Sequence, residues 1–113
     1  MTVYKIIAAD LWKAAEHDGV FAGARMDLQD GFIHLSTGRQ VRRTAQLYFK
    51  RQDGLVLVAV DDASLGGALR YEPSRDGDLF PHLYGLLPTA AVLSVRPLPL
   101  GADGNHIFPA DVD

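Results

Sequence analysis

Two short segments of this chain hold side chains that could carry chemistry, and the first spans residues 31–37. It places the imidazole of His34 near the hydroxyls of Ser36 and Thr37. Thr37 and Gln40 fit a capping box, which predicts that a helix begins here, with the Thr37 hydroxyl and the Gln40 amide each satisfying a backbone N–H. Because the first N–H groups of a helix lack partners and its dipole is positive there, we expect this segment to bind an anion.

Three arginines follow in the early part of that helix, Arg39, Arg42 and Arg43. The helix dipole disfavours cations at this end, so a phosphate bound nearby would compensate for their charge. We therefore expect phosphate or sulfate at the helix start, nearest to Ser36, Thr37 and Arg39. A structural role fits the same pattern: a capping threonine, a hydrogen-bonded strand histidine and a solvated basic face.

The second segment, residues 80–85, surrounds the imidazole of His82 and the phenol of Tyr84 with proline, phenylalanine and glycine. Its composition predicts a loop that could cradle an aromatic ring and offer two hydrogen-bonding groups, and Gly85 would permit close backbone approach. An aromatic loop that only covers the core would have the same composition. Glu72, on the solvated face of a predicted strand, is a candidate carboxylate partner.

The composition is that of an ordinary globular protein and excludes several function classes. With 113 residues, of which 22% are charged, we expect a single domain over residues 1–113. The formal net charge of −3 argues against non-specific binding to nucleic acids or anionic membranes. The chain has no cysteine and no close-spaced histidine pair, so we expect no metal site. No apolar run approaches membrane-spanning length, and the chain turns polar at Asp10, so a cytoplasmic location is the default expectation.

Strand patterns dominate the elements that must position these segments. Apolar, β-branched and aromatic runs predict strands over residues 3–7, 32–35, 55–60, 69–72 and 90–95. Asp10 and Gly19 predict the start and end of a short helix over residues 11–17, in addition to the helix that begins at Thr37. Few, short helices and a strand-rich second half favour an α+β fold with a mixed or antiparallel sheet and two short helices.

Several strings of residues together resemble the bacterial domain-of-unknown-function family 952, and the resemblance covers nearly the whole chain. The most specific string is residues 80–85, and the others lie at residues 4–6, 12, 15, 31–36, 40 and 69–72. The family is similar in turn, and more distantly, to the ADP-ribosyltransferase superfamily and, within it, to the RNA 2′-phosphotransferases. This resemblance implies an ADP-ribosyltransferase-like split sheet that holds NAD in a cleft.

The same resemblance implies three motif positions on separate strands. Lys5 takes the first position, His34 with Ser36 the second, and either Glu72 or His82 the third. The superfamily has His or Arg at the first position, and a lysine there could neutralise a pyrophosphate but would orient a ribose poorly. Glu72 could stabilise an oxocarbenium-like centre, whereas a cationic His82 could not.

Two function classes fit these residues. In the first, the chain is a transferase or glycohydrolase that takes NAD or a related nucleotide as its substrate. The phosphate would lie at residues 36–43, the ring would pack on Phe80 or Tyr84, and Glu72 or His82 would act at the ribose with His34 nearby. In the second, the same fold is a non-catalytic module that binds a nucleotide or metabolite, or docks a protein partner through the aromatic segment.

Overall fold

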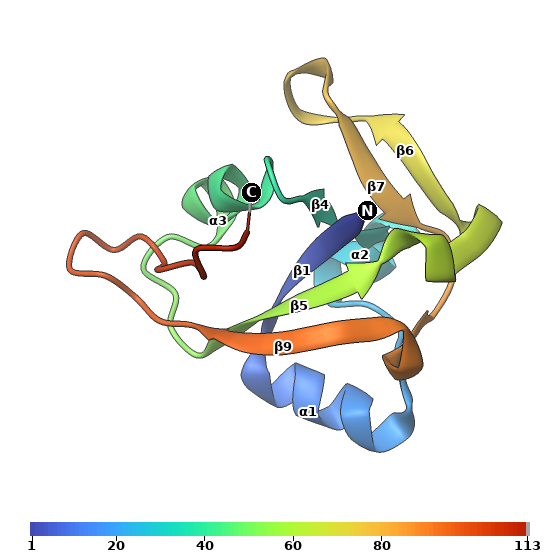
Figure 1. Cartoon of the computed structure of the whole chain (residues 1–113), viewed down its shortest axis with the longest axis horizontal. Helices are drawn as coiled ribbons and strands as arrows, with labels where there is room; N and C mark the ends of the chain where they lie inside the picture. Colours follow the sequence, from blue (N-terminus) through green and yellow to red (C-terminus); the bar gives the residue numbers. More distant parts are fainter. Residues whose placement is uncertain (113) are drawn as a thin grey trace.

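The computed structural model describes residues 1–112, and a four-stranded antiparallel sheet forms its centre. The strand order is β4 (Ser36–Thr37), β1 (Thr2–Ala8), β5 (Leu55–Asp61) and β9 (Val92–Leu98). Figure 1 shows β1, β5 and β9 running side by side. The apolar run that predicts a covered central strand is β5, which is buried on both faces and paired on both edges.

A second antiparallel sheet has the order β3 (Ile33–His34), β7 (Leu79–Leu83) and β6 (Leu69–Pro73). A further pair joins β2 (Val20–Phe21) to β8 (Leu87–Pro88). The prediction of a loop over residues 80–85 was therefore wrong for most of that segment. Residues 80–83 of this segment belong to β7, which pairs with β3 on one side and β6 on the other. Aromatic side chains are common in strands, so this composition fits a strand as well as a loop.

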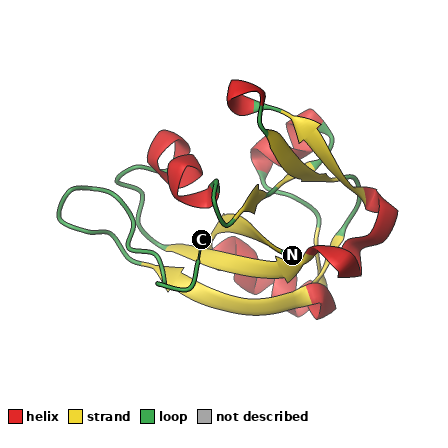
Figure 2. Cartoon of the chain, turned by 45° about the horizontal axis from the view of Figure 1, so that its top comes forward, coloured by secondary structure: helices red, strands yellow, loops and turns green. Residues whose placement is uncertain are grey.

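Within residues 1–112 three α-helices connect the strands, where the sequence predicts two. Figure 2 shows the helical segments in red, at the ends of the yellow strands. They are α1 (Ala9–Asp18), α2 (Arg25–Asp30) and α3 (Val41–Tyr48), and 3-10 turns cover Asp62–Ala68, Arg75–Gly77 and Thr89–Ala91. As predicted, α1 ends at Gly19, whose φ of 84° lies in the left-handed region. No helix within residues 1–112 is long and apolar enough to cross a membrane.

The predicted start of the second helix at Thr37 was wrong. Thr37 belongs to β4 and pairs with Val3 of β1, and the helix begins only at Val41. Half of the expected capping pattern is present, because the Thr37 N–H donates to Oε1 of Gln40 at 3.0 Å. Pairing with β1 thus holds Thr37 in extended backbone, and the Gln40 side chain stabilises the turn between strand and helix.

Apolar side chains pack on both faces of the two central strands of this sheet, β1 and β5. Successive residues of a strand point to opposite faces. Val3 and Ile7 of β1 pack on one face with Trp12 of α1, whereas Ile6 packs on the other with Val41 of α3. The α+β class and the antiparallel form of the predicted sheet are confirmed.

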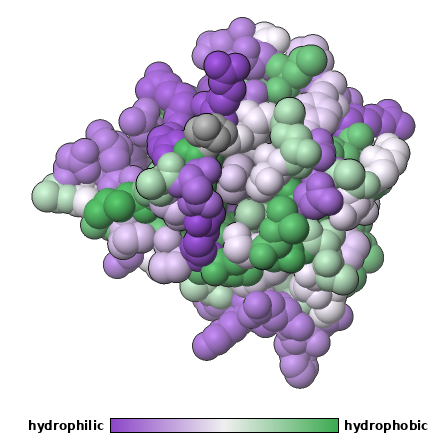
Figure 3. Space-filling model, in the orientation of Figure 1, coloured by the Kyte–Doolittle hydropathy of each residue, from purple (hydrophilic) through white to green (hydrophobic). Residues whose placement is uncertain are grey.

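Strand β9 forms one edge of this sheet and leaves part of its outer face in solvent. Leu93 and Val95 alternate with less exposed residues along it. In Figure 3, hydrophobic atoms gather along the band that β9 occupies in Figure 1. Scattered exposed apolar residues of this kind are normal on globular proteins.

Candidate functional site

A cleft of about 640 Å³ opens beside the edge of β1. β4 pairs only with Val3 and Tyr4, so among the described residues no strand lies beside that edge from Lys5 to Ala8. The lining comes from β1, the first turn of α1, α2, the β3–β4 segment, α3 with the residues that follow it, and the β6–β7 hairpin. The break in strand pairing therefore creates the cleft, with α2 and α3 contributing to its walls.

The carboxylate of Asp27 accepts hydrogen bonds from several residues that surround one wall of the cleft. It is 3% exposed and accepts four hydrogen bonds. Nζ of Lys5 and Nδ1 of His34 lie 2.9 and 2.7 Å from Oδ1, and the backbone N–H of His34 also donates to Oδ1 at 3.0 Å. The backbone N–H of Ala24 donates to Oδ2 at 2.8 Å. Asp27 thus ties α2 to both β1 and β3.

These contacts determine the charge of the Lys5–Asp27 pair. Burial alone would raise the pKa of Asp27, but the hydrogen bonds of His34 and Ala24 and the charge of Lys5 outweigh it and hold that pKa well below its usual range. Burial lowers the pKa of Lys5, and the charge and hydrogen bond of Asp27 offset part of that effect. Asp27 is therefore ionised at neutral pH and is the counterion of a buried lysine.

His34 is held between two carboxylates. Its Nδ1 lies 2.7 Å from Asp27, and its Nε2 lies 2.9 Å from Oδ2 of Asp30, which follows one turn later on α2. Only the doubly protonated ring has two N–H groups and can donate to both carboxylates at once. The geometry therefore favours a cationic His34 in the cleft.

His82 lies directly across the strand pair from His34. The register of β3 and β7 places the two residues opposite each other, and their ring centroids are 5.8 Å apart. Nδ1 of His82 lies 2.8 Å from Oε1 of Glu72, and the Tyr84 hydroxyl donates to the same oxygen at 2.7 Å. Hydrogen bonds from Tyr84 and then His82 lower the pKa of Glu72, so its carboxylate stays ionised.

Phe32 packs against both histidines. Its ring stacks on His82 with a centroid distance of 4.1 Å and an interplanar angle of 28°, and it lies 4.6 Å from the ring of His34. The Tyr84 ring is a third neighbour at 5.3 Å. This packing restricts the rotation of the histidine rings.

A second polar group, formed by Ser36, Thr44 and Arg75, also lines the cleft. Oγ of Ser36 lies 3.1 Å from Oγ1 of Thr44, and Nη1 of Arg75 donates to that Thr44 oxygen at 3.2 Å. The Arg75 guanidinium also lies over the ring of Phe80, 4.9 Å from its centroid. Arg75 thereby carries a positive charge into the cleft from the hairpin.

The structure brings some of the predicted site residues together and separates others. His34 and His82 line one cleft, as predicted, together with Lys5, Ser36 and Phe80. Five other predicted residues do not line it, namely Thr37, Arg39, Glu72, Tyr84 and Gly85. Glu72 is hydrogen-bonded directly to His82, and Tyr84 is hydrogen-bonded to Glu72.

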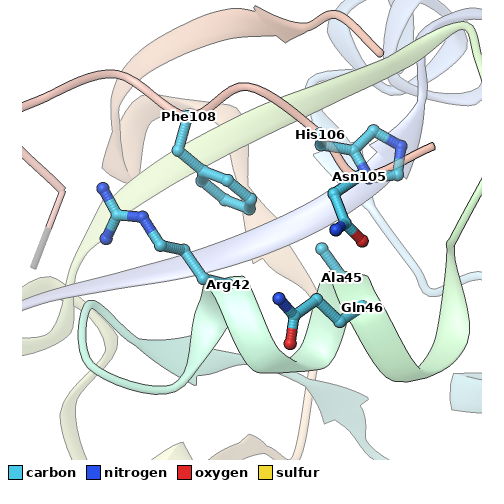
Figure 4. A pocket seen from close by; sticks show the side chains of 6 residues that line it. All are labelled: Arg42, Ala45, Gln46, Asn105, His106 and Phe108. Carbon is cyan, nitrogen blue, oxygen red and sulfur yellow. The ribbon is translucent and has the colours of Figure 1, made fainter. Parts of the chain in front are cut away.

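Two of the three arginines expected near a phosphate at the helix start, Arg42 and Arg43, have other partners. Arg42 donates to the backbone carbonyls of Val112 and Pro109, and its guanidinium lies over the ring of Phe108. It lines a separate small cavity of about 100 Å³ between α3 and the C-terminal segment, shown in Figure 4. Arg43 contacts Gln46 on its own helix.

Asp27 and Arg75 are site residues that the sequence reasoning missed. Asp27 lies in α2, whose six residues are too few to show helical periodicity. The structure shows how closely the chain packs here, because Gly23 has a φ of 126° and a Cβ there would lie 2.9 Å from Cβ of Asp27. Among the described residues, no group of three His, Asp or Glu side chains is arranged to hold a metal ion.

The fold and the site define a small α+β protein with antiparallel sheets and a cleft that carries two opposed histidines. The chain belongs to the family described as protein of unknown function (DUF952), whose model matches residues 6–95. The family predicted from the motif strings is confirmed.

Solved structures of one related protein share this fold. The crystal structure of protein CC0527 from Caulobacter crescentus is 45% identical, with 95% of this chain and 94% of that chain covered and a TM-score of 0.92. Its solution NMR structure is 46% identical, with 92% and 90% covered and a TM-score of 0.84. Among curated proteins, none matches this chain.

Proposed function

We propose that the cleft binds a nucleotide of the NAD type and that the protein processes it at the ribose, as an ADP-ribosyltransferase-like transferase or a glycohydrolase. The observation that carries this proposal is that a single cleft joins an apolar wall to a cluster of basic side chains and two histidines. Its volume of about 640 Å³ falls within the range of roughly 300–1,000 Å³ that small-molecule sites occupy.

An aromatic ring of the ligand would cover the apolar rim. Leu11, Met26 and Tyr48 line the cleft, and each leaves between 49% and 60% of its surface in solvent. Phe49 and Phe80 continue this wall inward. A nicotinamide or adenine ring placed there would bury this surface, which gives affinity through the hydrophobic effect.

The phosphates would lie at the basic end of the cleft. Its lining contains Lys5, Arg25 and Arg75, along with His34 held in its cationic geometry, against the carboxylates of Asp27 and Asp30. This local excess of positive charge occurs in a chain whose formal net charge is −3, which favours an anionic ligand at this place. Arg75 is the best placed, because Lys5 is already paired with Asp27.

A non-catalytic binding module is the second candidate, and the position of Glu72 favours it. Glu72 does not line the cleft, and the two carboxylates that do, Asp27 and Asp30, are both bonded to His34. A direct electrostatic stabiliser of a ribose cation therefore needs a shift of one of these groups. Turnover is what separates the two candidates.

The test compares two arginine variants for NAD binding by calorimetry and thermal shift. Arg75→Ala should weaken binding by roughly 5- to 150-fold, the equivalent of losing a charge-assisted hydrogen bond of about 1–3 kcal/mol. Arg39→Ala is the matched control, because Arg39 is exposed and outside the cleft. NAD should raise the melting temperature of the wild type and of the control to the same extent.

Three results would count against this proposal in different ways. No binding of NAD or ADP-ribose to the wild type refutes it. Weaker binding in Arg39→Ala but not in Arg75→Ala places the phosphate at the start of α3 instead. Binding without release of nicotinamide, with water, protein or RNA as acceptors, leaves only the non-catalytic module.

A further inference from the structure

We infer that Glu72 fixes the tautomer of His82 so that Nε2 presents a proton acceptor to the cleft, which makes His82 the general base and Glu72 a positioning residue behind it. The inference deepens the proposed function and rests on it for the identity of the substrate. The sequence leaves Glu72 and His82 as alternatives for the third motif position, and the inference gives each residue a separate role.

The first step is the hydrogen-bond direction at His82. A carboxylate only accepts, so Nδ1 of His82 must carry the proton that it donates to Glu72 over 2.8 Å. A neutral ring has one proton, and Nε2 is then left with its lone pair. No hydrogen bond of Nε2 to any of residues 1–112 accompanies this contact, and His82 lines the cleft while Glu72 does not.

The second step is the rigidity of this arrangement. Glu72 receives a second hydrogen bond from the Tyr84 hydroxyl at 2.7 Å, and these two donors hold its pKa below the usual range. Arg70 lies over the Tyr84 ring at 5.2 Å. On the other side, Phe32 stacks on the His82 ring, which is 5% exposed. The ring therefore has one orientation, with Nδ1 toward Glu72.

The third step is the contrast with His34. Both nitrogens of His34 lie within 2.9 Å of carboxylates, Asp27 and Asp30, so neither nitrogen is open to accept a proton from a ligand. It supplies positive charge 5.8 Å from His82, measured between ring centroids. The two histidines thus have opposite tasks: His34 attracts the phosphate, and His82 moves the proton.

The reaction that follows from these roles is the displacement of nicotinamide from NAD by a hydroxyl acceptor such as water. Nε2 of His82 takes the proton of the attacking hydroxyl as its oxygen forms a bond to C1′ of the ribose. The bond between C1′ and the pyridinium nitrogen breaks, its electron pair goes to that nitrogen, and nicotinamide leaves as a neutral molecule. The imidazolium of His82, stabilised by Glu72, then releases its proton to solvent.

The experiment measures the tautomer of His82 by ¹⁵N NMR and nicotinamide release from NAD in the same variants. In the wild type at a pH where the ring is neutral, Nδ1 should carry the proton and Nε2 should not. In Glu72→Gln the amide nitrogen can donate to Nδ1 when the proton lies on Nε2, and the amide oxygen accepts from Nδ1–H less strongly than a carboxylate does, so part of the population should move its proton to Nε2. Nicotinamide release should then fall by about 10²- to 10⁴-fold, the usual contribution of general base catalysis, while the Kd for NAD stays within about 3-fold.

Two further variants keep the result interpretable. Tyr84→Phe removes one donor to Glu72 and keeps the bond to His82, so the tautomer should persist and release should fall by less than about 10-fold. Glu16→Gln makes the same chemical change on an exposed residue of α1 and should alter neither readout. Circular dichroism and melting temperature establish that each variant is folded.

The tautomer decides this inference whether or not NAD is the substrate. A wild-type ring that carries its proton on Nε2 would overturn it. So would a Glu72→Gln variant with the same populations of the two tautomers as the wild type, because a carboxylate favours the proton on Nδ1 more strongly than an amide does. Unchanged nicotinamide release in Glu72→Gln, with the tautomer altered, would overturn the role of His82 as base. Failure of NAD to bind would instead refute the proposed function, with the NMR result for His82 standing on its own.

Discussion

Replacing Asp27 by Asn should be the most damaging conservative change in the cleft. The substitution keeps the shape of the side chain and removes its charge, so the buried Nζ of Lys5 loses its counterion. One of the two carboxylate oxygens is replaced by an NH2 group, which donates and cannot accept. Nδ1 of His34 and two backbone N–H groups also depend on the Asp27 oxygens. The cost therefore combines an uncompensated buried charge with weakened hydrogen bonds.

The magnitude can be worked from the burial of the pair. The side chains of Lys5 and Asp27 are 9% and 2% exposed, and breaking a buried ion pair by removing one partner typically costs about 3–5 kcal/mol. Lys5→Met removes the other partner but leaves Asp27 with three hydrogen-bond donors, so it should cost less, roughly 1–3 kcal/mol. Against a domain stability of about 5–15 kcal/mol, only the first change approaches the point of unfolding.

Urea denaturation followed by Trp12 fluorescence and circular dichroism measures both variants. The pH dependence adds a second readout. Since the pKa of Asp27 is lower in the folded than in the unfolded state, folding favours the ionised form, and this stability is present above about pH 4 and lost as the pH falls further. Asp27→Asn should therefore lose less stability than the wild type on acidification. A cost below about 0.5 kcal/mol, or a larger cost for Lys5→Met than for Asp27→Asn, would refute this reasoning.

Two other perturbations test single features of the fold. Gly23→Ala should destabilise by about 1–3 kcal/mol in urea denaturation, and more than Gly19→Ala, because both glycines have positive φ but only the Cβ at Gly23 meets Asp27, at 2.9 Å; equal costs would contradict the contact. Burial, and then the hydrogen bond to Asp62, raise the pKa of Tyr71 to about 12, so its contribution to stability is present below about pH 10 and lost as the pH rises toward 12. Wild-type melting temperature should fall more steeply than that of Tyr71→Phe across this window, and parallel curves would argue against it.

The local sequence pattern was sufficient to predict an element where neighbouring residues alone determine its conformation or its burial. β5 was predicted as a covered central strand because its side chains are apolar without interruption, and the structure pairs it on both edges. Gly19 was predicted as the end of α1 because a glycine after a helical run readily takes a positive φ. The prediction that His34 and His82 share a cleft was based on their segments, which differ from the apolar strands around them. It was confirmed, because both residues line one cleft and lie opposite each other on paired strands.

Local pattern failed where a long-range partner decides the conformation. Thr37 and Gln40 have the residues of a capping box, but pairing with Val3 places Thr37 in a strand. The partner of Lys5 lies 22 residues away on α2, and nothing in the sequence around Asp27 marks it as buried. The sequence therefore predicted that the two histidines share a cleft, and it did not predict the carboxylate of Asp27 that accepts a hydrogen bond from one of them.

NMR titration with NAD, observed at the histidine rings, tests the account most directly. The ring signals of His34 and His82 should shift together as the cleft fills, because both rings line it. His106 is an internal control, since it lies in the separate small cavity and should not move (Figure 4). Shifts confined to His106 or to the amides of residues 39–43, or no shift at any histidine at millimolar NAD, would contradict the claim that this cleft is a nucleotide site.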